Sequence, residues 1–577
     1  MKPRDFWVTA VAGVLAVAAG LGPNATVRAS DRDGPVAAET VGPGARSKLT
    51  GSVIFFHPDG AGLNHWGAAR LYFKGLDGSL NWDRLPAMAV YRGHMGNVIT
   101  GTSNGAATTH AFGYKVDGLG SFGKDGDGNR GLDRAILSLS GYAGSAMREA
   151  ANAGIPVGVV NDGHIGEPGT GAFLAEVGNR DNWPEITRQM IQGRPGMNDA
   201  APWVIMGGGE ADTLPPGDML LHRNVNQERG APLHSRASLR NDTLNLQAEW
   251  NAKGSGNLSN DPLQFDDAIV VRTRAEFERL KQALSANRRY APRVLGLFAF
   301  QDLFNDRDEQ DLIDRGFVRP DLAPGRTGPP PRKEGRIVLW GDHDPAEPGY
   351  RPPSFAEMTE VAITILDRAA HQQRHPGNRR FFLVAEQESV DNFGNNNNAV
   401  GLLHALRDTD DAIGVALRHL GRNPRTLILT AADSDAGGLQ VVSPARAGAM
   451  PPTNTVAPGQ APDAAGTANA NPSSPSLGGV PDGKAVANFV DGVEGRQSLL
   501  FVTEPDQFGS HLQFGILWSG TGDYSGGILS RAAGHNAGLM TSLSSQRFDN
   551  VDVYRLMHLT LFGRLLDYPT APRAPTR

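Results

Sequence analysis

Four acidic residues, each placed just after a segment with the character of a buried strand, have the chemistry needed to bind cations. They are Asp59, Glu386, Asp391 and Asp433. In a doubly wound sheet the loops at the carboxyl ends of parallel strands converge on one crevice. Carboxylates gathered there would repel one another unless cations lay among them, so a multi-cation site is expected. The alternative is that each aspartate only caps the following helix. Capping is a common role for a single aspartate, but it is a poor explanation for all of these acidic residues together.

A second segment, residues 100–109, has the composition to hold an anion and to carry a nucleophile. It consists entirely of glycine, alanine, serine, threonine and asparagine. Small residues let one backbone approach another, and a hydroxyl at a helix start lies where amide groups and the helix dipole stabilise negative charge. A serine in this setting becomes a nucleophile if a metal takes the place of a base. Taken alone, the pattern is also typical of an ordinary loop.

Six short, almost continuously apolar segments are the strands that must position these groups, since this is the pattern of strands buried on both faces. Helical patterns lie between them, and one begins with a capping box formed by Ser354 and Glu357. The alternation predicts an α/β fold with a large, mostly parallel central sheet flanked by helices on both faces, with loop insertions. The expected strands are Ser52–Phe56, Pro156–Val160, Trp203–Met206, Val294–Phe298, Phe381–Ala385 and Thr426–Thr430.

Composition narrows the class of protein. The 577 residues carry 55 Lys+Arg against 61 Asp+Glu, a formal net charge of −6 that argues against a nucleic-acid-binding surface. Cysteine is absent, which excludes disulfides, thiolate nucleophiles and cysteine-ligated metals. Hydrophobic residues make up 40 % of the chain, which is enough to build a sizeable core.

Residues 1–29 have the pattern of a secretory signal peptide. Lys2 and Arg4 precede an apolar run, and small residues follow at a cleavage site. The alternative is an uncleaved membrane anchor. The mature chain is therefore expected to be periplasmic or secreted and to contain no membrane span. Residues 319–333 are expected to form a surface loop, and residues 443–484 a flexible low-complexity insertion.

Several motifs in the same chain order resemble those of the alkaline phosphatase family. Residues 52–69 resemble the family's opening strand and Asp-Gly-Met-Gly-type turn, and residues 100–116 resemble its nucleophile segment. The resemblance covers most of residues 50–570, which implies one alkaline-phosphatase-like catalytic domain. Further matches are Val204–Gly209 to a Leu-Gly-Gly-Gly strand end, Pro353–Met358 to a Pro-Ser-Leu-Ala-Glu-Met helix start, and Asp549–Asp552 to the element before the last helix.

The resemblance implies catalytic roles for individual residues. An ungapped match to Gly113 and Lys115 puts the family's nucleophilic serine on Ser103. Thr102 is the rival, since it carries a hydroxyl one residue away. Arg180 lies in a segment similar to the family's Val-Asn-Arg-Asn, which implies that it clamps phosphate oxygens. The planar guanidinium suits that task because it can meet two oxygens at once.

The metal ligands implied by the resemblance depart from the family's usual pattern. Three positions usually held by histidine have oxygen-bearing side chains here, namely Asn395, Ser434 and Asp523. Glu167 and Thr170 stand in for a further ligand pair, with the hydroxyl moved by one position. The histidines off register, expected to be structural or to support the ligands from behind, include His57, His110, His511 and His535. The retained carboxylates are Asp59, implied to bridge two metals, Glu386, at a magnesium-type position, and Asp391 and Asp433, which would hold the two metals that flank the phosphate.

The favoured hypothesis is metal-dependent hydrolysis of small phosphate monoesters through a phosphoseryl, or phosphothreonyl, intermediate that releases inorganic phosphate. Because an oxygen-only shell suits hard cations, Ca²⁺ and Mg²⁺ are favoured over Zn²⁺. One alternative is a phosphodiesterase or sulfatase on the same scaffold. Another is a non-catalytic homologue that binds metal or phosphate. A homodimer is compatible with the sequence.

Overall fold

The computed structural model describes most of the chain after residue 49, and these residues belong to one compact unit. The expected signal peptide (1–29), the loop at 319–333 and the insertion at 443–484 lie outside the described residues. Within them, no helix combines the length and the apolar character that crossing a bilayer requires. The described residues are 50–120, 122–225, 228–254, 267–304, 351–373, 379–442, 490–492, 495–496, 501–509, 513–542 and 548–569.

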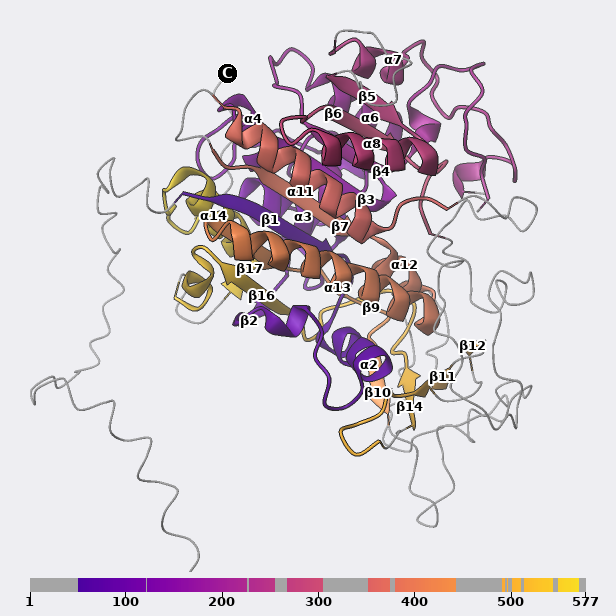
Figure 1. The fold of residues 1–577 in the computed structure, drawn as a ribbon, viewed down its shortest axis with the longest axis vertical. Helices are drawn as coiled ribbons and strands as arrows, with labels where there is room; N and C mark the ends of the chain where they lie inside the picture. The colour runs from indigo at the N-terminus through magenta and orange to yellow at the C-terminus, as the bar shows by residue number, and fades with distance from the viewer. Residues whose placement is uncertain are drawn as a thin grey trace, which may run out of the picture. The chain divides into compact units, whose positions relative to one another are not determined.

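A ten-stranded sheet forms the centre of this unit, and β1 (Ser52–Pro58) runs through its middle (Figure 1). β1 pairs in parallel with β7 (Phe382–Gln387) on one side and with β8 (Thr426–Thr430) on the other. Every residue of these three strands is buried, which explains their almost continuous apolar sequence. Because the three strands run in the same direction, their carboxyl ends meet at one edge of the sheet.

The sheet is parallel over most of its width and antiparallel on one side. Next to β8, β16 (Leu529–Gly534) runs antiparallel to both β8 and β2 (Ala87–Arg92), and β17 (Phe548–Asp549) pairs with β2 in parallel. All six expected strands and the mostly parallel sheet are confirmed, whereas the antiparallel side was not expected. Beyond β7 the parallel part continues through β3 (Val157–His164), β4 (Val204–Gly208), β6 (Arg293–Leu297) and β5 (Ala268–Val271).

The helices begin where capping residues predict. Ser354 and Glu357 form the expected capping box at the start of α11: the Ser354 hydroxyl accepts from the Glu357 amide at 3.2 Å, and the Glu357 carboxylate accepts from the Ser354 amide at 3.0 Å. The described α-helices are α2 (Leu63–Lys74), α3 (Ser103–Phe112), α4 (Ala146–Asn152), α5 (Pro168–Gly171), α6 (Trp183–Gln192), α7 (Leu246–Asn251), α8 (Arg274–Ala286), α11 (Phe355–His371), α12 (Ser389–Asn395), α13 (Ala399–Arg422) and α14 (Asn550–Phe562).

Two neighbouring phenylalanines of β1 show that helices cover both faces of the sheet, as expected. Successive side chains of a strand point to opposite faces. The Phe56 ring lies 6.5 Å from Phe355 at the start of α11, whereas the Phe55 ring lies 5.3 Å from His110 in α3. α13 packs beside α11, and α14 packs beside α3. In Figure 1, α11 and α13 cross the face of the sheet nearest to the viewer.

Small β elements complete the described fold. β9 (Asp435–Ala436) and β15 (Asp523–Tyr524) form a two-residue antiparallel pair, which brings a segment near the C-terminus next to the loop that follows β8. A separate five-stranded sheet consists of β10 (Gln440–Val442), β11 (Val490–Gly492), β12 (Gly495–Arg496), β13 (Phe501–Val502) and β14 (Gln513–Leu517).

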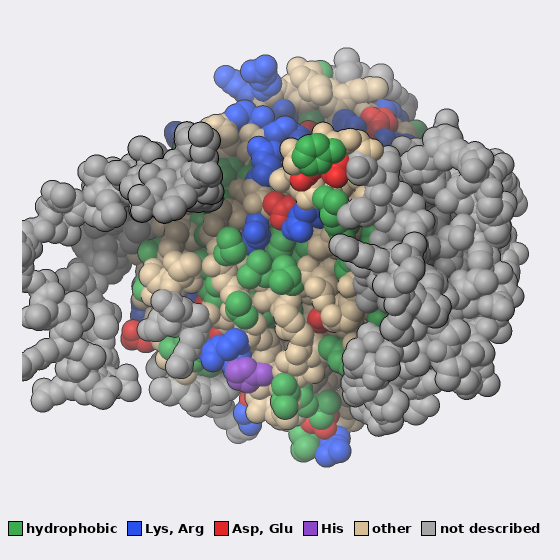
Figure 2. Space-filling model, turned by 90° about the horizontal axis from the view of Figure 1, so that it is seen from below, with side chains coloured by type: hydrophobic (Ala, Val, Ile, Leu, Met, Phe, Trp, Pro, Cys, Tyr) green, Lys and Arg blue, Asp and Glu red, His purple; other side chains and the backbone are tan. Residues whose placement is uncertain are grey.

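The surface carries both signs of charge. On the face seen in Figure 2, acidic and basic side chains are interspersed among hydrophobic and uncharged polar ones. This mixture agrees with the small net charge of the whole sequence. Acidic side chains that are close together and enclosed lie instead inside the molecule, at the carboxyl edge of the parallel strands.

Candidate metal centre and active site

The carboxyl ends of β1, β7 and β8 bring together acidic residues that are far apart in the sequence. Asp59 directly follows β1, Glu386 is the last residue but one of β7, and Asp433 lies three residues beyond β8. The parallel register places His57 of β1 opposite Glu386 of β7. Asp59 and Glu386 are fully buried, and Asp433 is 1 % exposed. The expected convergence of these carboxylates at one edge is therefore what the structure shows.

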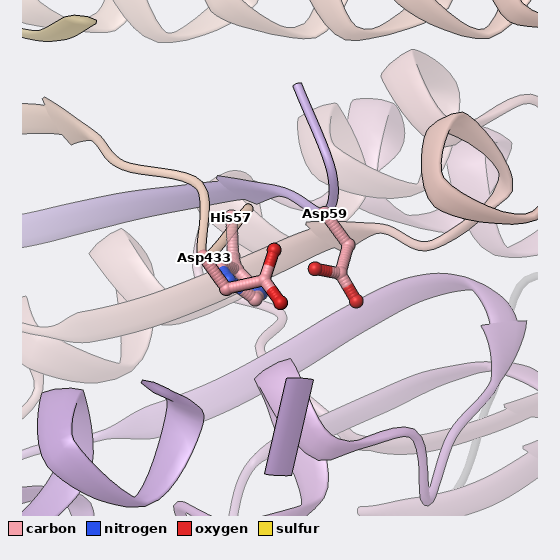
Figure 3. Close-up of side chains that lie close together, drawn as sticks. All are labelled: His57, Asp59 and Asp433. Carbon is pink, nitrogen blue, oxygen red and sulfur yellow. The ribbon is translucent and has the colours of Figure 1, made fainter. Parts of the chain in front are cut away.

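One group, which we name the His57 cluster, consists of His57, Asp59 and Asp433 (Figure 3). Each residue offers one ligand atom, and these atoms lie within 4.8 Å of one another. Oδ1 of Asp433 accepts hydrogen bonds from the amides of Gly60 at 3.1 Å and Ser434 at 2.6 Å. Its Oδ2, both oxygens of Asp59 and Nε2 of His57 form no hydrogen bond with any described residue. Buried polar atoms without protein partners are groups that a bound cation or an ordered water would satisfy.

A second group, the Glu388 cluster, joins Asp59 to Glu386 and Glu388. Glu388 is 4 % exposed, and its Oε2 has no hydrogen-bond partner in the described part of the chain. Glu388 was not among the predicted ligands, because the family resemblance assigns that role to Glu386 and Asp391. Its position two residues beyond Glu386, in the turn after a buried strand, was the signal that would have found it.

Glu386 differs from the other carboxylates because groups of the protein donate hydrogen bonds to both of its oxygens. Oε1 accepts from the Gly169 amide at 2.8 Å, and Oε2 accepts from the Thr170 amide at 2.9 Å and from Asn161 Nδ2 at 2.5 Å. The Thr170 hydroxyl lies 3.2 Å from Oε2 and also close to two backbone carbonyls. These bonds fix the orientation of Glu386, whereas both oxygens of Asp59 and Oε2 of Glu388 have no hydrogen-bond partner among the described residues.

Arg180 lies beside the Glu388 cluster and forms an ion pair with Glu167. Nη2 of Arg180 and Oε2 of Glu167 are 3.6 Å apart, with the Arg180 side chain 32 % exposed. Glu388 and Asp59 also act electrostatically on the guanidinium. The structure thus brings both predicted residues to the site. A half-buried guanidinium next to buried carboxylates is placed to meet an anion that enters from solvent.

A third group, Asp391, Asn395 and Asp523, contains the other predicted ligands. Asn395 Nδ2 lies 3.0 Å from both oxygens of Asp391 and 3.1 Å from Oδ1 of Asp523. Asp391 and Asn395 are four residues apart on α12, so they share one face of that helix, and β15 delivers Asp523. Ser434, which is fully buried, also interacts with Asp523. Every side chain of this group offers oxygen as a ligand.

The two predicted hydroxyls lie at the start of α3. Thr102 is the N-cap: its hydroxyl donates to the Gly118 carbonyl at 3.0 Å and accepts from the Gly105 amide at 3.3 Å. Ser103 is the first residue of the helix and is 6 % exposed. A methyl group at Gly101 would lie 2.3 Å from the Asp433 carbonyl, so the backbone before α3 touches the loop that carries Asp433.

Burial and crowding give these groups unusual acidities. Burial, reinforced by neighbouring carboxylates, raises the pKa of Glu388, Asp391 and Asp433 well above the ordinary value. Burial opposes the charge of His57, but the Glu386 hydrogen bond and the charges of Asp59 and Asp433 together raise the pKa of His57 to about 9. The site therefore attracts positive charge, which protons or cations can supply. This property fits the multi-cation expectation.

The histidines that the sequence places off register lie in different surroundings. His57 was expected to be structural or to stand behind the ligands, yet it belongs to a cluster with Asp59 and Asp433. The ring of His110 instead hydrogen-bonds the Tyr91 hydroxyl at 2.8 Å, and neither it nor His535 belongs to either cluster. His511 lies outside the described residues. His57 was not predicted as a ligand because it is off register with the family's metal-binding histidines.

Fold and site together define an α/β protein that gathers buried carboxylates, a histidine and a helix-borne serine at the carboxyl edge of a parallel sheet. The sequence profile of the alkaline phosphatase family matches residues 51–460. The chain belongs to this family.

Individual relatives match parts of the chain. Streptomycin-6-phosphate phosphatase of Streptomyces griseus is 32 % identical over 164 residues, which cover 28 % of this chain and 30 % of that protein. Alkaline phosphatase of Gadus morhua is 24 % identical over 385 residues, covering 63 % of this chain and 65 % of that protein. The chain thus spans less than two thirds of the length of either relative.

Among solved structures, alkaline phosphatase of Thermus thermophilus is similar to this chain, with a TM-score of 0.53 and 17 % sequence identity. The superposition covers 92 % of this chain and 96 % of that structure. At such low identity the likeness concerns the fold, and it agrees with the large, mostly parallel sheet described above.

Proposed function

We propose that the chain is a metal-dependent hydrolase of small phosphate monoesters that works through a phosphoseryl intermediate. The observation that carries the proposal is the set of buried, unpartnered oxygens of Asp59 and Asp433 among the described residues, next to a helix that begins with Ser103. Membership in the alkaline phosphatase family supports the reaction class.

Three sets of residues would hold divalent cations. The His57 cluster and the group of Asp391, Asn395 and Asp523 provide two positions, and Glu388 with Asp59 and Glu167 provides a third. Bound cations supply the positive charge that lowers the pKa of an attacking hydroxyl and that stabilises phosphate oxygens and the leaving group. Thr170 takes the supporting role of fixing Glu386 rather than the expected one of a ligand.

Ser103 is the nucleophile in this proposal. Its oxygen attacks phosphorus in line with the leaving alkoxide, a phosphoserine forms, and water then hydrolyses the ester to inorganic phosphate. The first amides of α3 and the positive end of the helix dipole stabilise charge on the phosphate oxygens. Thr102 is less suited because its hydroxyl already donates to the Gly118 carbonyl and accepts from an amide.

Arg180 binds two phosphate oxygens and stabilises the charge that spreads over them in the transition state. Its guanidinium forms an ion pair with Glu167. The ion pair holds the side chain near the position it needs. Substrate binding then exchanges one carboxylate partner for phosphate oxygens.

Rates on three model esters test the proposal. Protein supplied with divalent cations should hydrolyse a phosphate monoester faster than a phosphodiester or a sulfate ester, because Arg180 and three cation positions surround a dianionic group. Preference for the diester or the sulfate would replace the proposal with the corresponding esterase. Binding of inorganic phosphate without turnover of any ester would indicate a binding protein.

The proposed location is the periplasm or the exterior of the cell, on the basis of the signal-like pattern in residues 1–29. A fusion of these residues to a reporter that functions only after export would test it. Retention of the reporter in the cytoplasm would contradict the proposal.

A further inference from the structure

The imidazole of His57 is completely buried, yet one of its two nitrogens has no hydrogen-bond partner among the described residues. Nδ1 lies 3.4 Å from Oε1 of Glu386, and because a carboxylate accepts hydrogen bonds, Nδ1 is the nitrogen that donates. Nε2 is buried and forms no hydrogen bond with the described residues. A buried polar atom without a partner costs free energy, so such atoms in a folded protein usually meet water, an ion or a ligand.

Both oxygens of Asp59 and Oδ2 of Asp433 likewise have no hydrogen-bond partner among the described residues. His57, Asp59 and Asp433 can each direct one ligand atom into a space where the three atoms are within 4.8 Å of one another. Two ligands of one cation, each bonded at about 2.0–2.4 Å, are separated by at most about twice that distance. A protonated His57 held only by charge would donate from Nε2 to one of the carboxylates, and no such hydrogen bond is present in the described part of the chain.

We propose that His57 is a metal ligand, with its Nε2 completing a cation site together with Asp59 and Oδ2 of Asp433. Glu386 has a positioning role, because metal-bound histidines commonly donate their other nitrogen to a carboxylate that fixes the ring. Asp433 is followed by Ser434, where the family motif has histidine. The imidazole therefore comes from β1 instead of from the loop after β8. This inference deepens the proposed function. The catalytic use of the cation rests on that proposal, whereas the binding of the cation by His57 does not.

The two main cation positions consequently differ in chemistry. One nitrogen and carboxylate oxygens suit a borderline cation such as Zn²⁺. The group of Asp391, Asn395 and Asp523 offers oxygen alone and suits Ca²⁺ or Mg²⁺. The chain would thus combine two kinds of metal, whereas the sequence pattern indicated hard cations throughout.

Metal counting on dialysed protein tests the inference. Wild type, His57→Gln and His419→Gln are stripped with chelator, dialysed against micromolar Zn²⁺ with millimolar Ca²⁺, and measured by elemental mass spectrometry. His419 is a matched control because it is also buried with an unpartnered Nε2 among the described residues, but it belongs to neither cluster. Wild type and His419→Gln should retain zinc. His57→Gln should bind zinc at least about 100-fold more weakly, beyond the loss typical of a residue that only orients a ligand, and should keep its Ca²⁺.

Zinc X-ray absorption of the wild type gives a second result that needs no variant. Outer-shell scattering from an imidazole supports the inference, and an oxygen-only shell overturns it. Full zinc retention by folded His57→Gln also overturns it. If His57→Gln is unfolded by circular dichroism, His57→Asn replaces it in the same count. If His57→Gln loses zinc and the wild-type protein hydrolyses no ester, His57 is a ligand but the proposed function is wrong. If His57→Gln keeps its zinc and the wild-type protein is an active phosphatase, the proposed function holds but His57 is not a ligand.

Discussion

Ser103 and Thr102 carry neighbouring hydroxyls, but the structure gives them different surroundings. The Thr102 hydroxyl makes two hydrogen bonds to the backbone as the cap of α3, and Ser103 is the first residue of the helix itself. Residue identity alone left the two as rivals. The capping geometry favours Ser103 as the nucleophile.

Ser103→Ala should abolish formation of a covalent phosphoenzyme, because the attacking oxygen is removed while the amides at the start of α3 remain. Labelled phosphate trapped at low pH and located by peptide mapping measures this. Thr102→Val is the matched variant: it should destabilise the protein by about 1 kcal/mol through loss of the cap and still form phosphoserine. Phosphate found on Thr102 in the wild type would contradict the assignment.

Arg180→Ala should weaken inhibition by inorganic phosphate and reduce kcat/KM at least about 10-fold, since each charge-assisted hydrogen bond contributes about 1.5–3 kcal/mol. Both kcat and KM should change because the contact exists in the bound state and in the transition state. Arg188→Ala is the control: Arg188 pairs with Glu185 on α6, and its loss should leave both constants unchanged. An unaltered phosphate inhibition constant in Arg180→Ala would show that the guanidinium does not touch phosphate.

At the scale of elements, one buried carboxylate holds the turn between β7 and α12. Asp162 of β3 accepts from the Glu388 amide at 2.7 Å, from the Ser389 amide and hydroxyl, and from the Gln387 side chain. This turn carries Glu386 and Glu388 and leads into Asp391. The backbone of the cation site is therefore set by a residue that is not itself in either cluster.

Asp162→Ala should lower the free energy of unfolding by about 3 kcal/mol, because it leaves several buried donors without an acceptor. It should also weaken cation binding about 10- to 100-fold, as loss of supporting groups around a metal usually does. Ser354→Ala, which removes a helix cap outside the clusters, should cost about 1 kcal/mol and leave cation affinity intact. Thermal unfolding and calorimetric titration measure both effects; equal cation affinity in the two variants would refute the role given to Asp162.

The buried strands were predictable because strands covered on both faces consist of continuous apolar runs, as Ser52–Pro58 and Phe382–Gln387 do. The antiparallel side was not, because the positions of Ala87–Arg92 alternate between partly or fully buried and exposed and carry no continuous apolar signal. Carboxylates that match a family motif, such as Asp433, were predictable as well. His57 was not, because its significance arises only from two strands that pair across more than 300 residues of sequence, whereas Glu388 carried a local signal in its position two residues beyond Glu386.

At the scale of the whole molecule, the buried titratable groups should make the metal-free protein sensitive to pH. Burial raises the pKa of Asp435 to about 7 and that of Asp162 to about 8, compared with about 3.9 in an unfolded chain. Between these values the folded chain binds more protons than the unfolded one, so stability falls as pH rises. His57 acts in the same direction: its stabilisation is complete below about pH 6.5 and is lost as pH rises through about 9.

The melting temperature of the protein in chelator should therefore be lower at pH 9 than at pH 5, although buried His65, whose pKa burial lowers to about 4, opposes the decrease below about pH 6.5. Addition of divalent cations should reduce this decrease, because cations then provide the positive charge that protons supply at low pH. Differential scanning calorimetry across this range, with and without cations, measures the effect. A metal-free melting temperature that increases between pH 5 and pH 8 would contradict the buried-carboxylate explanation.

The short β9–β15 pair determines when the site can be completed during synthesis. Asp523 joins Asp391 and Asn395 only after the ribosome has passed residue 523, and β16, which pairs with β8, is made later still. A nascent or truncated chain that ends before β15 holds the earlier carboxylates without this last contributor. If this group binds a cation as proposed, the cation would therefore enter late in biogenesis. For a chain that is exported before it folds, the metal would come from the compartment in which the C-terminal segment docks.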